Sequence, residues 1–157
     1  METRKAKKGI MKRSAAKTRL ILYTDGGARG NPGPAAIGAV IGDKRYGERI
    51  GEATNNIAEY RAVVFALKKA KQLLGKENAA TADLEVRSDS ELVVRQLRGE
   101  YRVKEETLFP LFIEVWNARQ DFASVVFKEI PREENKIADS LVNEALDGRG
   151  TMQALFQ

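Results

Sequence analysis

The sequence predicts an α/β fold built on one mixed sheet. Three short strand-like segments come first, and helical and strand-like segments then alternate along the rest of the chain. Strands joined by tight turns pair antiparallel, whereas strands joined through a helix pair parallel. The predicted order βββαβααβα therefore gives an antiparallel meander followed by parallel strands with helical crossovers. A chain of 157 residues is long enough to bury one such core.

Each predicted strand is a short, mostly apolar run bounded by turn residues. The five strands are expected at 20–24, 36–41, 46–54, 84–86 and 125–127. Asp25-Gly26-Gly27 is expected to end the first strand, and a Gly/Pro-rich loop then reaches Pro34. A hairpin turn at 42–44 joins the second strand to the third, so the sheet is expected to begin as a meander.

The predicted helices carry apolar residues at intervals of three and four. They are expected at 57–74, 91–97, 108–121 and 135–146. Gly75, Gly99 and Gly148 lie just past three of these segments, where glycine commonly ends a helix. Pro110 lies in the first turn of the third helix, where its missing N–H breaks no helical hydrogen bond. A charged connection at 101–107 precedes that helix.

The chain contains neither Cys nor His. This composition excludes disulfide scaffolds, Cys/His zinc sites, cysteine nucleophiles and Ser-His-Asp triads. A divalent metal would have to bind oxygen ligands, which favours Mg²⁺, Mn²⁺ or Ca²⁺. No apolar run has membrane-spanning length, and none follows the basic N-terminus as in a secretory signal. A cytoplasmic protein without a membrane partner is expected.

The net charge of +5 is unevenly distributed. Eight of the 27 basic residues and one of the 22 acids lie in residues 1–19, so this segment carries +7 and the remainder −2. Residues 1–19 are therefore predicted to form a flexible basic arm, either a solubilising extension or a segment that binds phosphates. Residues 20–148 are expected to form the domain. The apolar tail at 149–157 could dock on it, although its last residues, LFQ, resemble a protease-site remnant.

Four acids are candidates for a shared site: Asp25, Glu59, Asp89 and Asp139. Asp25 and Asp89 follow the first and fourth predicted strands, and parallel neighbours would end about 5 Å apart. Glu59 shares a helix face with apolar residues and is therefore expected to point toward the sheet. Carboxylates so placed repel one another, and divalent cations would offset that repulsion.

Each acid alone also has a structural interpretation. Asp25 can set a turn, Asp89 can cap a helix, and Glu59 and Asp139 lie early in helices, where acids interact favourably with the helix dipole. Their combined placement favours a shared metal site instead. Acidic oxygen ligands suit phosphodiester hydrolysis by two metal ions about 3.5–4 Å apart, a mechanism that requires neither His nor Cys.

Four ordered motifs carry a resemblance to a known family. They are TDGGARGNPGP at 24–34, TNNIAE at 54–59, SDS at 88–90 and NKIADSL at 135–141. In residue type and spacing they resemble the motifs of type 1 ribonuclease H, and the resemblance covers about residues 20–146. Each motif alone is moderately specific, whereas four in this order are far more so.

The resemblance implies a ribonuclease H-like fold with sheet order 3-2-1-4-5, in which the first three strands are antiparallel and helices flank the sheet. It implies an endonuclease that cleaves the RNA strand of RNA/DNA hybrids and leaves 5′-phosphate and 3′-hydroxyl ends. Two Mg²⁺ ions, or Mn²⁺ in their place, would be held by Asp25, Glu59, Asp89 and Asp139. A monomer is expected, and cleavage of double-stranded RNA stays open.

The resemblance also implies substrate contacts. Asn31, Asn55 and Asn56 would contact the substrate backbone and minor groove, with Thr54 and Asn55 near a pocket for a DNA phosphate. The backbone around Ala28 would join them. Recognising RNA requires a hydrogen bond to the 2′-hydroxyl, which donates and accepts, and Asn amides can do both. Turn and helix-cap roles are the alternative for Asn55 and Asn56.

The sequence departs from the family at two places. Many members carry a His in the loop before the last acid, whereas here that loop, 130–135, contains Glu133 and Glu134. Either glutamate could substitute for the His or act as a helix-start acid. Gln is frequent where Glu91 stands, and an anion beside a phosphodiester is unfavourable unless it points away or meets a metal.

Two other functions remain open at the level of sequence. A nuclease of the same fold could act on duplexes or junctions, as resolvases and transposase-type enzymes do, but the Gly-Asn-Pro-Gly loop and paired asparagines argue against it. A non-catalytic hybrid-binding module is the second alternative. Retention of all four acids argues against a pure binder, because acids repel phosphate.

Overall fold

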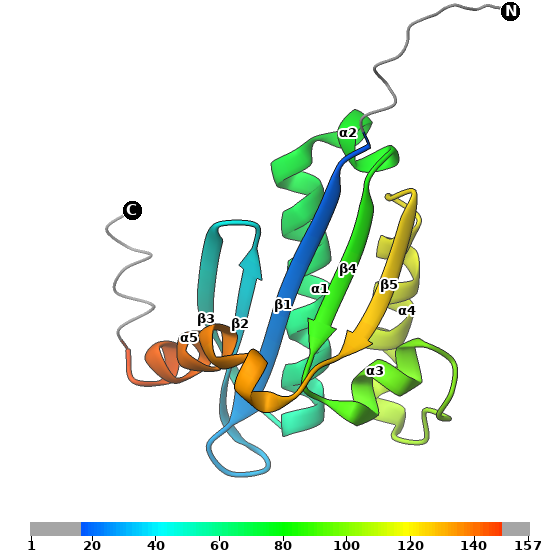
Figure 1. Ribbon diagram of the computed structural model, residues 1–157. Coiled ribbons are helices and arrows are strands. Elements are labelled where there is room, and N and C mark those ends of the chain that lie inside the picture. Colours follow the sequence, from blue (N-terminus) through cyan, green and yellow to red (C-terminus); the bar gives the residue numbers. More distant parts are fainter. Residues whose placement is uncertain (1–16, 149–157) are drawn as a thin grey trace, which may run out of the picture.

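A five-stranded mixed sheet runs through the computed structural model, which describes residues 17–148 (Figure 1). Its strands are β1 (Arg19–Ala28), β2 (Gly33–Ile41), β3 (Lys44–Ala53), β4 (Asp83–Ser88) and β5 (Ser124–Glu129). The spatial order is β3-β2-β1-β4-β5. β1 pairs antiparallel with β2, and β2 with β3, whereas β4 pairs parallel with both β1 and β5. The predicted fold class, strand order and strand directions are confirmed.

The helices are α1 (Asn55–Leu74), α2 (Lys76–Ala80), α3 (Glu91–Leu97), α4 (Phe109–Arg119) and α5 (Lys136–Leu146), with 3₁₀ turns at Glu106–Leu108 and Arg132–Glu134. α1 begins two residues before its predicted start because Thr54 caps it: the Ile57 N–H donates to Thr54 Oγ1 at 3.2 Å. The five-residue helix α2 was not predicted, since it is too short to show a helical period.

Helices cover both faces of the sheet (Figure 1). α1 packs on β1 and β2 and also contacts α4, whereas α5 lies across β2 and β3 on the other face. The main core lies between the sheet and α1, and its fully buried side chains include Leu22, Tyr60, Leu67, Leu84 and Val115. Burial of such apolar surface is the main contribution to the stability of the fold.

β1 is longer than predicted. Asp25-Gly26-Gly27 does not end the strand, because pairing with β2 continues through Asp25↔Gly38 and Gly27↔Ala36 to Ala28. The parallel pairing of β1 with β4 stops earlier, at Tyr23↔Arg87. Asp25 therefore lies within a strand, just beyond the end of the parallel ladder, and the predicted strand end was wrong.

Two glycines let helices approach this part of the sheet from its two faces. A Cβ on Gly26 would lie 2.3 Å from the carbonyl carbon of Ala58 in α1. A Cβ on Gly38, the strand partner of Asp25, would lie 2.3 Å from the carbonyl oxygen of Ala138 in α5. Side chains at these positions would push the helices away, so the glycines bring Glu59 and Asp139 close to Asp25.

Most of the predicted arm and all of the predicted tail lie outside residues 17–148. At the described start of the chain, Lys17 forms an ion pair of 3.3 Å with Asp83. Among residues 17–148, every helix is too short or too polar to cross a membrane.

Candidate active site

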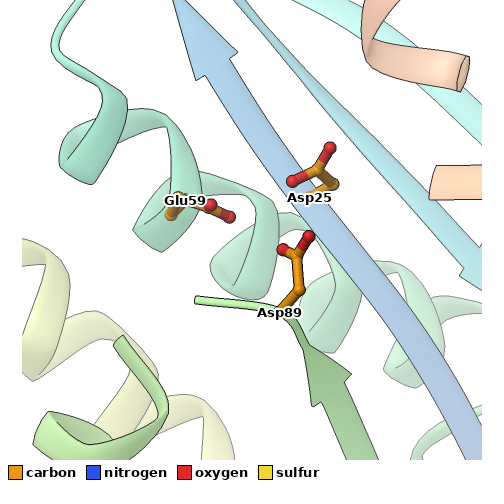
Figure 2. Close-up of side chains that lie close together, drawn as sticks. All are labelled: Asp25, Glu59 and Asp89. Atoms are coloured by element: carbon orange, nitrogen blue, oxygen red, sulfur yellow. The ribbon is translucent and has the colours of Figure 1, made fainter. Parts of the chain in front are cut away.

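Three acids converge where β1 and β4 stop pairing. Asp25 belongs to β1, Glu59 to α1, and Asp89 directly follows β4. One carboxylate oxygen from each lies within 4.8 Å of the others (Figure 2). Residues separated by up to 64 positions in the chain thus share one small volume. The strand and helix positions predicted that these three acids would lie together, although Asp25 lies inside β1 and not after its end.

A backbone hydrogen bond holds Glu59 in place, and the cap of the next helix leaves Asp89 to face it. The Gly26 N–H donates to Glu59 Oε1 at 3.1 Å, so the close approach of α1 to β1 also fixes the glutamate carboxylate. Asp89 is not the cap of α3, because Ser90 Oγ accepts from the Val93 N–H at 3.3 Å. With the cap role taken by Ser90, the Asp89 carboxylate faces the other two acids (Figure 2).

Asp139 is exposed in the first turn of α5 and lies outside the group of three. It is nevertheless close enough to act electrostatically and by hydrogen bonding on Asp25. Asn135, which is fully buried, anchors the start of α5: its Nδ2 donates to the carbonyl of Thr24 at 2.9 Å. The Asp139 N–H in turn donates to the Asn135 carbonyl at 3.1 Å. Asn135 thus connects the strand that carries Asp25 with the helix that carries Asp139, a role that was not predicted from the sequence.

Asp25 and Glu59, the acids most affected by burial, both favour the protonated form. Burial, followed by the charges of Asp89 and Asp139, raises the pKa of Asp25 from 3.8 to about 8. Burial, followed by the charge of Asp25, raises the pKa of Glu59 well above its ordinary value. Deprotonating the cluster is therefore costly unless a cation is bound. The donor set consists of carboxylate oxygens, which fits a hard divalent cation.

Arg132, in the loop before α5, places a positively charged side chain beside this cluster. Arg132 Nε lies 3.6 Å from Asp89 Oδ2, and the Arg132 charge also lowers the pKa of Glu59. Glu133 and Glu134 lie in the same 3₁₀ turn, are exposed, and border a cavity of about 300 Å³ together with Tyr23 and Val40. Glu133 and Glu134 were the expected candidates in this loop, whereas the residue that pairs with an acid of the cluster is Arg132.

The residues predicted to contact substrate lie together beside the acids. Ala28 N–H donates to Asn55 Oδ1 at 2.9 Å, and Asn55 N–H donates to Asn31 Oδ1 at 3.0 Å. Thr54 caps α1, as described above, and Asn56 Nδ2 donates to Glu105 Oε1 at 3.3 Å. The loop after β1 and the start of α1 therefore form one hydrogen-bonded unit. Asn31 and Asn55 have exposed side chains on it.

Glu91 is held by its neighbours in α3 and the following segment. The Tyr101 hydroxyl donates to Glu91 Oε2 at 2.8 Å, and Arg95 Nε lies 3.3 Å from the same oxygen. Arg95 also pairs with Glu100 at 3.0 Å and faces the Tyr101 ring. These contacts offset the charge of Glu91, which answers how an acid is accommodated two residues after Asp89.

The sequence matches one family model, described as "Reverse transcriptase-like", over residues 23–145. A bifunctional protein of Mycobacterium tuberculosis is 37% identical over 136 residues, which are 82% of this chain and 36% of that protein. A protein named Ribonuclease HI from Halobacterium salinarum is 39% identical over 135 residues, 82% of this chain and 65% of its own length. The chain thus spans between about a third and two thirds of these relatives.

The fold is also similar to solved structures. The crystal structure of LC11-RNase H1, an enzyme isolated from compost by a metagenomic approach, was determined in complex with an RNA/DNA hybrid. It is 47% identical to this chain, with a TM-score of 0.78, and the match covers 82% of this chain and 97% of that one. Sequence and fold therefore agree over nearly the whole of that protein.

Proposed function

The chain belongs to the ribonuclease H family, and we propose that it hydrolyses the RNA strand of RNA/DNA hybrids. The observation that carries this proposal is the convergence of Asp25, Glu59 and Asp89, with Asp139 beside Asp25. The similarity to a protein that was crystallised with a hybrid supports the choice of substrate. Water would add to the phosphorus and the bond to the 3′-oxygen would break, which leaves 5′-phosphate and 3′-hydroxyl ends.

We assign the four acids as ligands of two Mg²⁺ ions, for which Mn²⁺ could substitute. When bound, such ions activate a water and stabilise the leaving oxygen. Asp25, Glu59 and Asp89 would hold the ions together with Asp139, which lies close enough to act on Asp25. Arg132, near Asp89, would offset negative charge as the phosphate approaches.

The unit around the start of α1 would position the hybrid. The Asn31 and Asn55 amides and the backbone near Ala28 offer donors and acceptors, and a 2′-hydroxyl needs both. Thr54 and Asn55, at the N-terminus of a 20-residue helix, suit a DNA phosphate. We expect Asn56 to contact the minor groove, and we expect a single chain to bind one hybrid.

Cleavage of a labelled RNA/DNA hybrid tests the proposed function. Matched RNA, DNA and double-stranded RNA duplexes should be compared in Mg²⁺, in Mn²⁺ and in EDTA. We expect the RNA strand of the hybrid to be cut in either metal and no strand to be cut in EDTA. Cleavage of double-stranded RNA at a comparable rate would broaden the substrate class, whereas an intact hybrid in both metals would favour the binding-module alternative.

Substitution of single acids tests the assignment of the site. Asp25→Asn and Asp89→Asn should each abolish cleavage, because they remove a ligand charge from the cluster. Asp43→Asn is the matched control, since Asp43 is exposed in the hairpin turn between β2 and β3. Loss of activity in the control, or its survival in both ligand variants, would contradict the assignment.

A further inference from the structure

Two buried polar side chains, Tyr60 and Gln96, are hydrogen-bonded to each other outside the acidic cluster. Tyr60 follows Glu59 in α1 and is fully buried, and its hydroxyl donates to Gln96 Oε1 in α3 at 2.8 Å. Gln96, 4% exposed, uses its other amide atom: Nε2 donates to the carbonyl of Arg102 at 3.2 Å. Two consecutive hydrogen bonds therefore run from α1 through α3 to Arg102.

Arg102 belongs to the segment 98–105, which connects α3 to the 3₁₀ turn without forming a helix or strand. The segment carries Arg98, Arg102 and Lys104 against Glu100 and Glu105, and it borders an open groove of about 610 Å³ whose opposite wall includes Leu92 and Gln96 of α3. Its far end reaches the start of α1, where Glu105 accepts from Asn56. The groove therefore lies beside the unit proposed to hold the hybrid.

Backbone hydrogen bonds tie the first part of the segment to α3: the Glu100 and Tyr101 N–H groups donate to the Arg95 carbonyl at 2.8 and 3.1 Å. Beyond Tyr101 the main chain lacks such bonds to α3 among the described residues, and the ion pairs of Glu100 with Arg95 and Arg98 and the Tyr101–Glu91 bond are made by side chains on the surface. Surface ion pairs of this kind contribute little and weaken in salt. The Gln96 bond differs from these side-chain contacts, because it is partly buried and holds the main chain of the segment at Arg102.

We propose that Tyr60 and Gln96 are positioning residues for the hybrid: their hydrogen bonds fix segment 98–105 so that Arg102 and Lys104 meet the phosphates of a strand lying along the groove. The inference rests on the proposed function. Neither side chain touches the substrate. Tyr60 orients the Gln96 amide, and Gln96 holds the backbone carbonyl of Arg102, two residues before Lys104.

Steady-state kinetics of hybrid cleavage tests the inference. Tyr60→Phe removes only the hydroxyl, and Gln96→Met keeps the side-chain length but removes both bonds. Tyr46→Phe is the matched control, because the Tyr46 ring packs on Phe65 but its hydroxyl makes no hydrogen bond among residues 17–148. Assays should be run well below the Tm of every variant, so that a loss of stability alone does not lower the rate.

We expect KM to rise about threefold in Tyr60→Phe and about tenfold in Gln96→Met, the range that a net hydrogen-bond contribution allows, with kcat nearly unchanged. The double variant should match Gln96→Met alone, because Tyr60 acts through Gln96. Binding of the hybrid in EDTA gives a second readout. The slope of log Kd against log salt should fall by up to about 0.9 for each phosphate that the variant no longer neutralises.

The inference is overturned by an unchanged KM in both variants, by an equal rise of KM in Tyr46→Phe, or by a fall in kcat at constant KM. A lower Tm with wild-type KM and salt slope would also overturn it, because the pair would then serve stability alone. If the wild type leaves the hybrid intact, the proposed function itself fails, and this inference fails with it.

Discussion

At Asp25 the surroundings favour the carboxylic acid over the carboxylate. Its pKa is about 8 in the folded chain against an ordinary value of 3.8, so between these values the folded chain holds a proton that the unfolded chain has lost. Without divalent metal, the free energy of unfolding should therefore fall as pH rises from about 4 to about 8. Urea denaturation in EDTA at several pH values measures this fall.

Asp25→Asn supplies the control for this pH dependence. The variant lacks the titrating group, so its free energy of unfolding should decline less over the same pH window. Saturating Mg²⁺ should restore stability to the wild type at the upper end of the window, because the cation replaces the proton. A wild-type profile in EDTA that is flat, or that rises with pH, would show that Asp25 ionises normally.

Individual residue roles were predictable where backbone position determines them. Asp25, Glu59 and Asp89 could be grouped because strand ends and a helix face determine where their side chains point. Arg132 and Asn135 could not, since their roles depend on a short 3₁₀ turn and on a single hydrogen bond to Thr24. Neither a turn of that length nor a lone Asn gives a periodic pattern in the sequence.

Among the secondary-structure elements, α5 owes its position to Gly38. A methyl group there would meet the Ala138 carbonyl, so Gly38→Ala should displace α5 and move Asp139 away from Asp25. We expect a destabilisation of about 1–3 kcal/mol by overpacking, together with a loss of kcat. Urea denaturation and cleavage assays measure the two effects.

Gly27→Ala is the matched control for Gly38→Ala. Gly27 lies in the neighbouring strand, and a Cβ there would make only an ordinary contact of 3.6 Å with Val142 Cγ1. This variant should retain most of its stability and activity. If both variants behave alike, the close approach at Gly38 is not what positions Asp139.

The start of α1 gives a second prediction for an element. Thr54→Ala removes the acceptor for the Ile57 N–H and should lower the free energy of unfolding by about 1 kcal/mol. Thr54→Ser keeps a hydroxyl and should restore most of that loss. Because we assign Thr54 to the phosphate pocket, Thr54→Ala should also raise KM for the hybrid. Equal stability of the alanine and serine variants would contradict the capping role.

Element boundaries were less predictable than element types. α3 occupies its predicted range, because a cap residue and a following glycine mark its ends. The end of β1 was missed because Asp-Gly-Gly is typical of turns, whereas pairing with β2 and the close packing of α1 keep these residues in a strand. Tertiary contacts of this kind override local preference and leave no local signal.

At the scale of the whole molecule, the concentration of basic residues in the amino-terminal arm predicts that the arm strengthens binding of the hybrid. Deleting residues 1–16 removes six basic residues and one acid, which lowers the net charge from +5 to zero, and it keeps the Lys17–Asp83 pair. We expect weaker hybrid binding and a flatter dependence of Kd on salt. Titrations at several salt concentrations measure both, and identical curves for the two chains would show that the arm only adds solubility.

The directions of the strands were predictable from connectivity, whereas the order 3-2-1-4-5 was implied by the resemblance to a family. Tight turns join β1, β2 and β3 into a meander, and helical crossovers make β4 parallel to β1 and β5 parallel to β4. The position of the fourth acid was not predictable in the same way. Asp139 is exposed, and its distance from Asp25 is set by Gly38 and Asn135, contacts that exist only once two faces of the sheet are covered.

The ligands proposed for the metal ions lie in β1, in α1, directly after β4 and in α5, between positions 25 and 139. A ribosome-bound nascent chain has an incomplete set of acids until α5 has emerged from the exit tunnel. With this ligand set, we expect a nascent chain that lacks α5 to leave a hybrid uncut.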